Sequence, residues 1–84
     1  MVIVTIGDEA ANDIDALPMT MKARVAAVVA KLEGYPSVSG VKHLLHAWKG
    51  HLRVRTGDWR IIFTVSGDRL HIVRVAHRNE VYED

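Results

Sequence analysis

Cysteine is absent from this sequence of 84 residues, which excludes a disulfide framework and any metal site built from thiolates. Long apolar runs are missing as well. The longest, VAAVVA at residues 25–30, is far below the ~20 residues needed to cross a bilayer and lies between Arg24 and Lys31. The N-terminus has no basic segment followed by an apolar stretch and a cleavage site. We therefore expect a soluble protein that works in the cytoplasm.

Acidic residues are scarce in the second half of the chain. Residues 42–78 contain eight Lys and Arg against two Asp, an excess of +6, although the net charge of the whole chain is +1. Residues 1–20 show the opposite bias, with four acidic residues and no Lys or Arg. An excess of positive charge attracts polyanions. The alternative is a solvated surface that only keeps the protein soluble, and the charge count by itself favours that alternative.

Hydrophobic residues make up 49% of the chain, enough for one small domain over residues 1–84 with a modest core. The β-branched run at residues 2–6 predicts a strand. A helical hairpin is predicted next, because Asp8 can cap a helix that runs to Leu17 and Thr20 can cap a second one.

From residue 51 the apolar period changes to two, the period of a strand. Strands are predicted at 51–56, 59–65 and 69–77, joined by two Gly-Asp pairs that are typical of tight hairpin loops. The preceding loop, residues 35–50, is expected to be anchored by apolar side chains that pack under the sheet: Val41, Leu44, Leu45 and Trp48. The predicted fold class is α+β, with an N-terminal strand, a helical hairpin and then a three-stranded antiparallel meander.

A two-residue loop at residues 57–58 fixes how its flanking strands pair. It places Arg55 directly opposite Arg60 and Arg53 opposite Ile62, and side chains alternate between faces along each strand. One face is then apolar and is expected to lie under the helices: Leu52, Val54, Trp59, Ile61 and Phe63. The other face is predicted to expose Arg53, Arg55 and Arg60. Because like charges directly opposite each other destabilise a sheet, this arrangement favours a bound anion.

Two stretches, RVRTGDWRIIF at residues 53–63 and HRNEVY at residues 77–82, resemble the C-terminal half of RelE/ParE superfamily toxins from bacterial type II toxin–antitoxin modules. The resemblance implies a single RelE-like toxin domain over the whole chain, with a cognate antitoxin protein as partner and no cofactor, metal or membrane. RelE-like members cleave messenger RNA in the ribosomal A site. ParE-like members instead poison DNA gyrase.

The resemblance carries over residue by residue to a set of site positions that favours the nuclease branch. Two basic residues before the turn are matched by Arg53 and Arg55, and the arginine after the turn is matched by Arg60. The basic residue near the end of the last strand and the tyrosine beyond it are matched by Arg78, or its neighbour His77, and by Tyr82. The implied activity is a metal-independent, ribosome-dependent endoribonuclease that inhibits translation.

One departure from the family concerns proton transfer. The best-known RelE-like proteins have lysines at the positions of Arg53 and Arg55, and a guanidinium, which titrates above pH ~12, is no general base near neutrality. Some relatives use a histidine instead, which puts forward His77 first and His51 second.

The expected roles follow from this chemistry. Arginines suit phosphate binding and transition-state charge, which we assign to Arg53, Arg55 and Arg60. We place His77 or Arg78 near the leaving group, and we expect Tyr82 to stack on a nucleotide or to assist proton transfer. Each residue also has a structural alternative: a carbonyl hydrogen bond for His77, an ion pair with Glu80 or Glu83 for Arg78, and simple packing over the sheet edge for Tyr82. His43 and His46 lack a third ligand, so no metal site is expected there.

Three hypotheses remain open from the sequence. The first is the ribosome-dependent endoribonuclease, the second is a ParE-like inhibitor of DNA gyrase, and the third is an inactive homologue that only binds its antitoxin. Mapping of RNA ends distinguishes the first from the others, and supercoiling assays identify the second.

Overall fold

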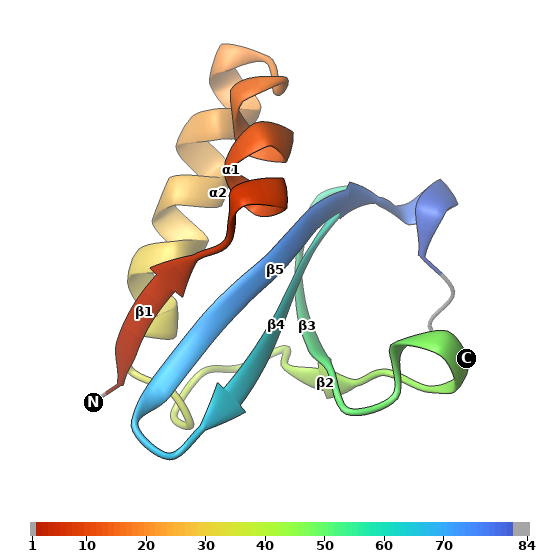
Figure 1. Ribbon diagram of the computed structural model, residues 1–84. Helices are drawn as coiled ribbons and strands as arrows, with labels where there is room; N and C mark the ends of the chain where they lie inside the picture. The colour runs from red at the N-terminus through yellow and green to blue at the C-terminus, as the bar shows by residue number, and fades with distance from the viewer. Residues whose placement is uncertain (1, 82–84) are drawn as a thin grey trace.

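Two helices lie against one face of a five-stranded sheet in the computed structural model, which describes residues 2–81 (Figure 1). The helices are α1, Asp8–Asp15, and α2, Met19–Leu32. The strands are β1 Ile3–Ile6, β2 Lys42–His43, β3 Leu52–Thr56, β4 Trp59–Ser66 and β5 Arg69–His77. Two short 3-10 helices follow β2 and β5: η1, His46–Trp48, and η2, Arg78–Glu80. The predicted α+β fold with its helical hairpin and meander is confirmed. Tyr82 lies outside the described residues.

The sheet is larger than the predicted meander because two short strands extend its edges. The strand order is β1-β5-β4-β3-β2. β1 pairs in parallel with β5, from Ile3 opposite Arg69 to Ile6 opposite Ile72, whereas the other neighbours are antiparallel. β2 covers only the Leu52 and Arg53 end of β3. These pairings join segments far apart in the chain, so a local sequence pattern does not reveal them.

The N-cap lies one residue before the predicted one in α1 and two residues before it in α2, so the predicted caps are wrong. The N-cap of α1 is Gly7, whose N–H donates to Ile72 O of β5 at 2.9 Å, and Asp8 is already the first helical residue. The N-cap of α2 is Pro18, and Thr20 lies inside the first turn. Neither helix has a side-chain cap. The reason is tertiary for α1, because the pairing with β5 holds the backbone at Gly7 extended.

The β3–β4 register agrees with the prediction in every pair, including Arg55 opposite Arg60 and Thr56 opposite Trp59. Gly57 opens the connecting turn with φ of +60°, while no positive φ occurs at Asp58. A positive φ at the first central residue alone defines a type II′ turn, whose twist matches that of the strands it joins. The glycine therefore fixes the register that aligns the arginines.

Apolar side chains pack on both faces of the sheet. The main core lies under the helices, with Phe63, Ile61 and Ile72 fully buried. A second, smaller cluster is formed by Leu44, Ile62, Ala76 and Val81, with Trp48 packed against it. Figure 1 shows η1 and η2, which adjoin this cluster in the chain, on the side away from the helices. Three of the four predicted loop anchors are buried against the sheet. Val41 contacts the main core, and Leu44 and Trp48 belong to the second cluster. The prediction is wrong for Leu45, which is 50% exposed.

Asp13 fixes α1 to the part of β5 that β1 does not cover. Its Oδ2 accepts from Arg74 Nε at 2.7 Å and from the backbone N–H of Val75 at 2.9 Å, and its Oδ1 accepts from Arg74 Nη2 at 3.2 Å. The pKa of Arg74 is raised above its ordinary value, chiefly by this hydrogen bond. The carboxylate thus takes the place of a neighbouring strand at this edge and holds β5 in position up to the candidate site.

Candidate functional site

Three arginines share the face of the β3–β4 hairpin that points away from the helices, as the register requires. Their exposure differs from the prediction. Arg55 is exposed, but Arg53 and Arg60 keep only 5% and 7% of their surface accessible. The expected exposed patch is therefore wrong for two of the three. The second apolar cluster includes Ile62, which lies directly opposite Arg53, so this face is packed rather than bare.

The two buried guanidinium groups have backbone acceptors. Arg53 Nη1 donates to Gly40 O at 2.8 Å, and Arg60 Nη1 donates to Gly57 O at the longer distance of 3.5 Å. A buried cation needs such partners because it loses its hydration. Arg53 is thereby tied to the loop before β2, and Arg60 to the turn that follows β3.

Arg55 and Arg60 face each other across the strand pair. Directly opposed side chains have Cβ atoms about 4.5–5.5 Å apart, and like charges on such a pair destabilise the sheet. An anion bound at Arg55 would relieve this repulsion.

A further cation lies next to the same turn. The backbone N–H of Arg78, the first residue of η2, donates to Asp58 O at 2.8 Å. The Nε of Arg78 lies 3.8 Å from Asp58 Oδ1. Both side chains are about 60% exposed, so the backbone bond carries more of the attachment than the ion pair does. Arg78 is therefore placed at the end of the hairpin that also carries Arg55. Sequence reasoning missed Asp58 as the residue that holds it.

His77 caps η2. Its Nδ1 accepts from the N–H of Asn79 at 3.2 Å, while its own N–H donates to Glu80 Oε1 at 3.3 Å. This reciprocal pair is a capping box. Because Nδ1 is the acceptor, the neutral ring carries its proton on Nε2, which is the ring nitrogen that the capping box does not use.

The register separates His77 from the arginine face. His77 lies opposite Trp59, and the two rings meet edge to face with centroids 5.3 Å apart. Trp59 packs against the main core, while its neighbour Arg60 points to the other face. The structure thus brings Arg53, Arg55 and Arg60 together on one face and places His77 on the other, with Arg78 at the hairpin end.

His51, the second candidate for proton transfer, is engaged elsewhere. Its Nδ1 donates to Trp48 O at 3.2 Å, and its ring packs edge to face on that of Trp48. Within residues 2–81, no cluster of three His, Asp or Glu residues could hold a metal ion. None of the helices in that range is long and apolar enough to span a membrane.

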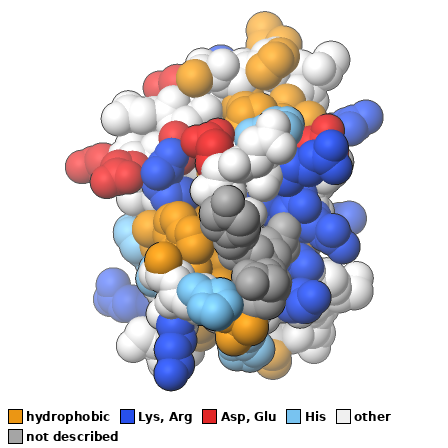
Figure 2. Space-filling view, turned by 90° about the vertical axis from the view of Figure 1, so that its right-hand side faces the viewer, with side chains coloured by type: hydrophobic (Ala, Val, Ile, Leu, Met, Phe, Trp, Pro, Cys, Tyr) orange, Lys and Arg blue, Asp and Glu red, His pale blue; other side chains and the backbone are white. Residues whose placement is uncertain are grey.

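Figure 2 shows the side of the molecule on which η1 and η2 lie, which is the right-hand side of Figure 1. Several Lys and Arg side chains gather along one edge of this view. The exposed cations among residues 42–78 include Lys42, Lys49, Arg55 and Arg78. Acidic side chains cluster mainly on the opposite side of the same view. Basic side chains thus gather mainly on one side of this view, although Arg74 of β5 lies against Glu9 and Asp13 of α1.

Comparison with known proteins gives consistent matches over nearly the whole chain. The model of the family described as ParE toxin of type II toxin-antitoxin system matches residues 4–82. Toxin RelE3 of Methanocaldococcus jannaschii is 27% identical over 75 residues, which cover 86% of this chain and 85% of that protein.

Two solved structures have the same fold. The toxin–antitoxin complex RelBE2 from Mycobacterium tuberculosis contains a chain with a TM-score of 0.80 and 25% identity, covering 92% of this chain and 98% of that one. The RelB–RelE antitoxin–toxin complex from Methanococcus jannaschii gives a TM-score of 0.71 at 20% identity, with 89% and 91% covered.

Proposed function

Since the chain belongs to the family of ParE toxins of type II toxin–antitoxin systems, it is the toxin of such a module, and we propose that it cleaves messenger RNA at the ribosome. The observation that carries this proposal is the register that sets Arg55 opposite Arg60 on the face that also bears Arg53. A hairpin that places like charges against each other is suited to an anionic ligand, and RNA phosphate is the anion that the RelE-like resemblance implies.

The proposed roles follow the exposure of each side chain. Arg55 and Arg78, the exposed cations at the hairpin end, hold the phosphate next to the scissile bond. Arg53 and Arg60 are buried behind them and add positive potential that stabilises the charge of the transition state. The 2′-oxygen of RNA attacks phosphorus as the P–O5′ bond breaks, and its proton passes to water or to Tyr82, so no step requires a metal.

Proton transfer to the leaving 5′-oxygen is assigned to His77 in its imidazolium form. Protonation of Nδ1 replaces the hydrogen bond that this atom accepts from Asn79 N–H, and Nε2–H then delivers the proton to the 5′-oxygen. RNA must then cross the end of the hairpin, where both faces of the sheet are within reach. Tyr82 keeps its proposed role in nucleotide stacking or proton transfer. A cognate antitoxin is the proposed partner, in line with the complexes in which the two structural neighbours were solved.

The test maps the 5′ ends of cellular messenger RNA after brief induction of the protein. New ends inside translated codons are expected, and they should disappear when translation initiation is blocked. His77→Gln should leave RNA binding unchanged and lower single-turnover cleavage, while Arg78→Ala should weaken both. Absence of new ends with normal growth arrest would contradict the nuclease.

Inhibition of DNA gyrase is the second candidate, because the matching family model is that of the ParE toxins. Its signature is loss of supercoiling activity by purified gyrase on addition of the protein, without new RNA ends. A protein that does neither and only binds its antitoxin is the third outcome.

A further inference from the structure

Arg24 of α2 lies beside the turn that joins β3 to β4. A Cβ at Gly57, the first residue of that turn, would be 3.7 Å from Arg24 Nη1 and 4.0 Å from Met21 Cε. Met21 and Arg24 are three residues apart, so they share the side of α2 that faces the turn. Met21 packs against the main core, whereas Arg24 is exposed. α2 therefore adds a solvent-facing cation to the end of the β3–β4 hairpin.

The guanidinium of Arg24 has no hydrogen-bond or ion-pair partner among residues 2–81. α2 contains no Asp or Glu, so Arg24 has no acidic neighbour one helical turn away. The acidic residue of the turn, Asp58, lies beside Arg78 instead. Since Arg55 and Arg78 are exposed at the same end of the hairpin, a third cation there strengthens the attraction of a polyanion.

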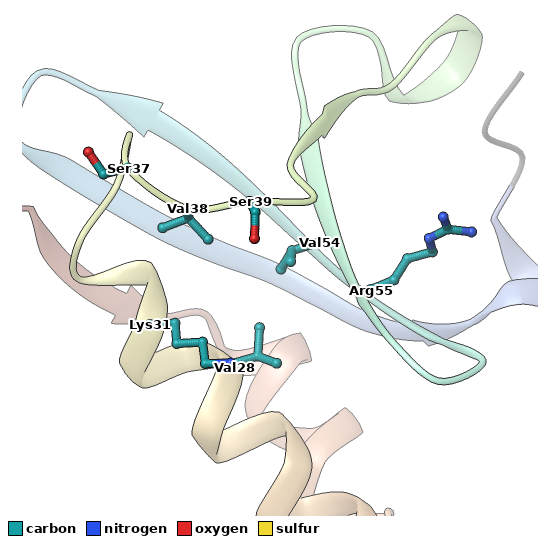
Figure 3. Close-up of a pocket in the computed structure, with 7 residues that line it drawn as sticks. All are labelled: Val28, Lys31, Ser37, Val38, Ser39, Val54 and Arg55. Carbon is teal, nitrogen blue, oxygen red and sulfur yellow. The ribbon is translucent and has the colours of Figure 1, made fainter.

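Arg24 and Arg55 lie on opposite sides of the hairpin. Arg55 shares with Arg60 the face of the sheet that points away from the helices, whereas Arg24 approaches the turn from the helix side (Figure 1). Figure 3 shows a cleft of about 500 Å³ between α2 and β3, with the guanidinium of Arg55 directed away from it. An RNA strand that contacts both cations must therefore cross the end of the hairpin at Gly57.

His77, the proposed proton donor, lies on the same side as Arg24. Its ring meets that of Trp59 with centroids 5.3 Å apart, and Trp59 packs against the main core under the helices. The 5′-oxygen that His77 protonates belongs to the nucleotide on the 3′ side of the scissile bond, so that nucleotide lies on the helix side of the hairpin end. The phosphate that follows this nucleotide lies on the same side, where Arg24 is an exposed cation at the turn.

We propose that Arg24 binds the phosphate immediately 3′ of the scissile phosphate. This assignment rests on the proposed function, in that the ligand is RNA and His77 serves the leaving group. RNA runs from Arg55 and Arg78 across the turn to Arg24, so cations from β3, η2 and α2 hold two successive phosphates. Each guanidinium offers paired N–H donors that match phosphate oxygens. Fixing both phosphates orients the P–O5′ bond that lies between them toward His77.

The test uses purified ribosomes programmed with synthetic messages that contain one mapped cleavage position. Three messages are compared: one with phosphates throughout, one with a neutral methylphosphonate linkage immediately 3′ of the scissile linkage, and one with it immediately 5′. All three carry 2′-O-methyl ribose on both neighbours of the nucleotide whose 2′-oxygen attacks, which protects the neutral linkages and leaves the nucleophile intact. Single-turnover cleavage is measured for the wild type and for Arg24→Gln, which removes the charge and keeps a good helix former.

Loss of one charge-assisted contact predicts matched effects. In the wild type, the 3′ neutral linkage should slow cleavage about tenfold. Arg24→Gln should slow cleavage of the all-phosphate message by the same factor, and should be insensitive to the 3′ neutral linkage while it stays as sensitive as the wild type to the 5′ one. Arg24→Lys keeps the charge without the planar fork and should recover part of the rate. Lys31→Gln, an equal charge change about two turns farther along α2, should match the wild type on every message.

Binding is measured separately, so that the result does not depend on cleavage. The purified protein is titrated with a short oligouridylate over a range of salt concentrations. Arg24→Gln should flatten the log–log slope by about 0.7, the value for one single-strand phosphate contact, and Lys31→Gln should leave the slope unchanged. Urea denaturation should give the wild-type midpoint for Arg24→Gln, because no contact within residues 2–81 is lost.

The outcomes are separable from those of the nuclease assay. Equal sensitivity of Arg24→Gln and the wild type to the 3′ neutral linkage would overturn the proposal even if the protein cleaves RNA. Weaker binding of the antitoxin by Arg24→Gln, with RNA cleavage and salt slope unchanged, would overturn it too and make Arg24 a protein contact. A flattened slope without any RNA cleavage would support Arg24 as an RNA contact and refute the nuclease.

Discussion

Arg55 and Arg60 are directly opposed on neighbouring strands, yet their side chains lie in different environments. Arg60 is 7% exposed and donates to Gly57 O, whereas Arg55 is exposed and its side chain points away from the cleft. Removing a buried side chain leaves a cavity and an acceptor without a donor, whereas removing an exposed one relieves the repulsion between the pair.

Opposite effects on stability are therefore expected from two like substitutions. Arg60→Ala should lower the free energy of unfolding by about 1–3 kcal/mol, as a buried hydrogen-bonded group does. Arg55→Ala should leave it unchanged or raise it by up to about 1 kcal/mol. Urea denaturation measures both. Arg69→Ala, exposed and opposite Ser66, is the control without an opposing cation. A loss at Arg55 as large as at Arg60 would contradict the assigned environments.

At the scale of elements, β5 depends on α1 for part of its edge. Asp13→Ala removes the acceptor of both Arg74 and the Val75 N–H, so we expect a loss of about 1.5–3 kcal/mol in the free energy of unfolding. Asp13→Asn keeps one acceptor oxygen and should lose less. Asp15→Asn, exposed on the same helix, serves as the control. Hydrogen exchange at Val75 should accelerate in Asp13→Ala, and an unchanged rate would show that the carboxylate does not hold this edge.

The β3–β4 turn depends on a glycine for its backbone conformation rather than for space. A Cβ at Gly57 would meet its nearest neighbours, Arg24 Nη1 and Met21 Cε, only at 3.7 and 4.0 Å, but the φ of +60° is unfavourable for any L side chain. Gly57→Ala should cost about 1–2 kcal/mol.

Gly34→Ala is the matched control for the turn, because Gly34 has no positive φ and its Cβ would lie 3.4 Å from Lys31 O. That substitution should be neutral or slightly stabilising. Thermal unfolding measured on both variants tests the difference. Equal losses would mean that crowding, not backbone conformation, limits the turn.

At the scale of the whole molecule, charge placement should matter more than net charge. Salt dependence of RNA binding reports the number of phosphates neutralised, with a log–log slope near −0.7 per single-strand contact. Arg55→Ala should therefore flatten the slope by about 0.7. The pair Asp8→Asn and Asp15→Asn, which raises the net charge from +1 to +3 at the acidic end, should leave the slope unchanged. A slope that follows net charge instead would indicate diffuse attraction without a defined site.

The sequence by itself determined the hairpin and its arginines, because those features depend on neighbours in the chain. A period of two, a glycine-first turn and strict alternation of faces are local, and they correctly placed Arg55 opposite Arg60 and Leu52 opposite Phe63. The helical hairpin followed from spacing in the same way. The predicted N-caps were misplaced by one residue in α1 and by two residues in α2. For α1 the reason is that Gly7 is held by β5, a contact that no local signal reports.

Only the tertiary structure decided which of these arginines meets solvent. Leu44 precedes the meander in the chain and Val81 follows it, and both pack on Ile62 and Ala76. Strict alternation predicts that this face of the sheet is polar and exposed, but these contacts make it a second core. The parallel pairing of β1 with β5 likewise joins segments more than 50 residues apart in the chain. The edge of β3 is open at Arg55 because β2 pairs only with Leu52 and Arg53. Periodicity assigns a side chain to a face, but burial depends on what covers that face, and distant segments of the chain provide that cover.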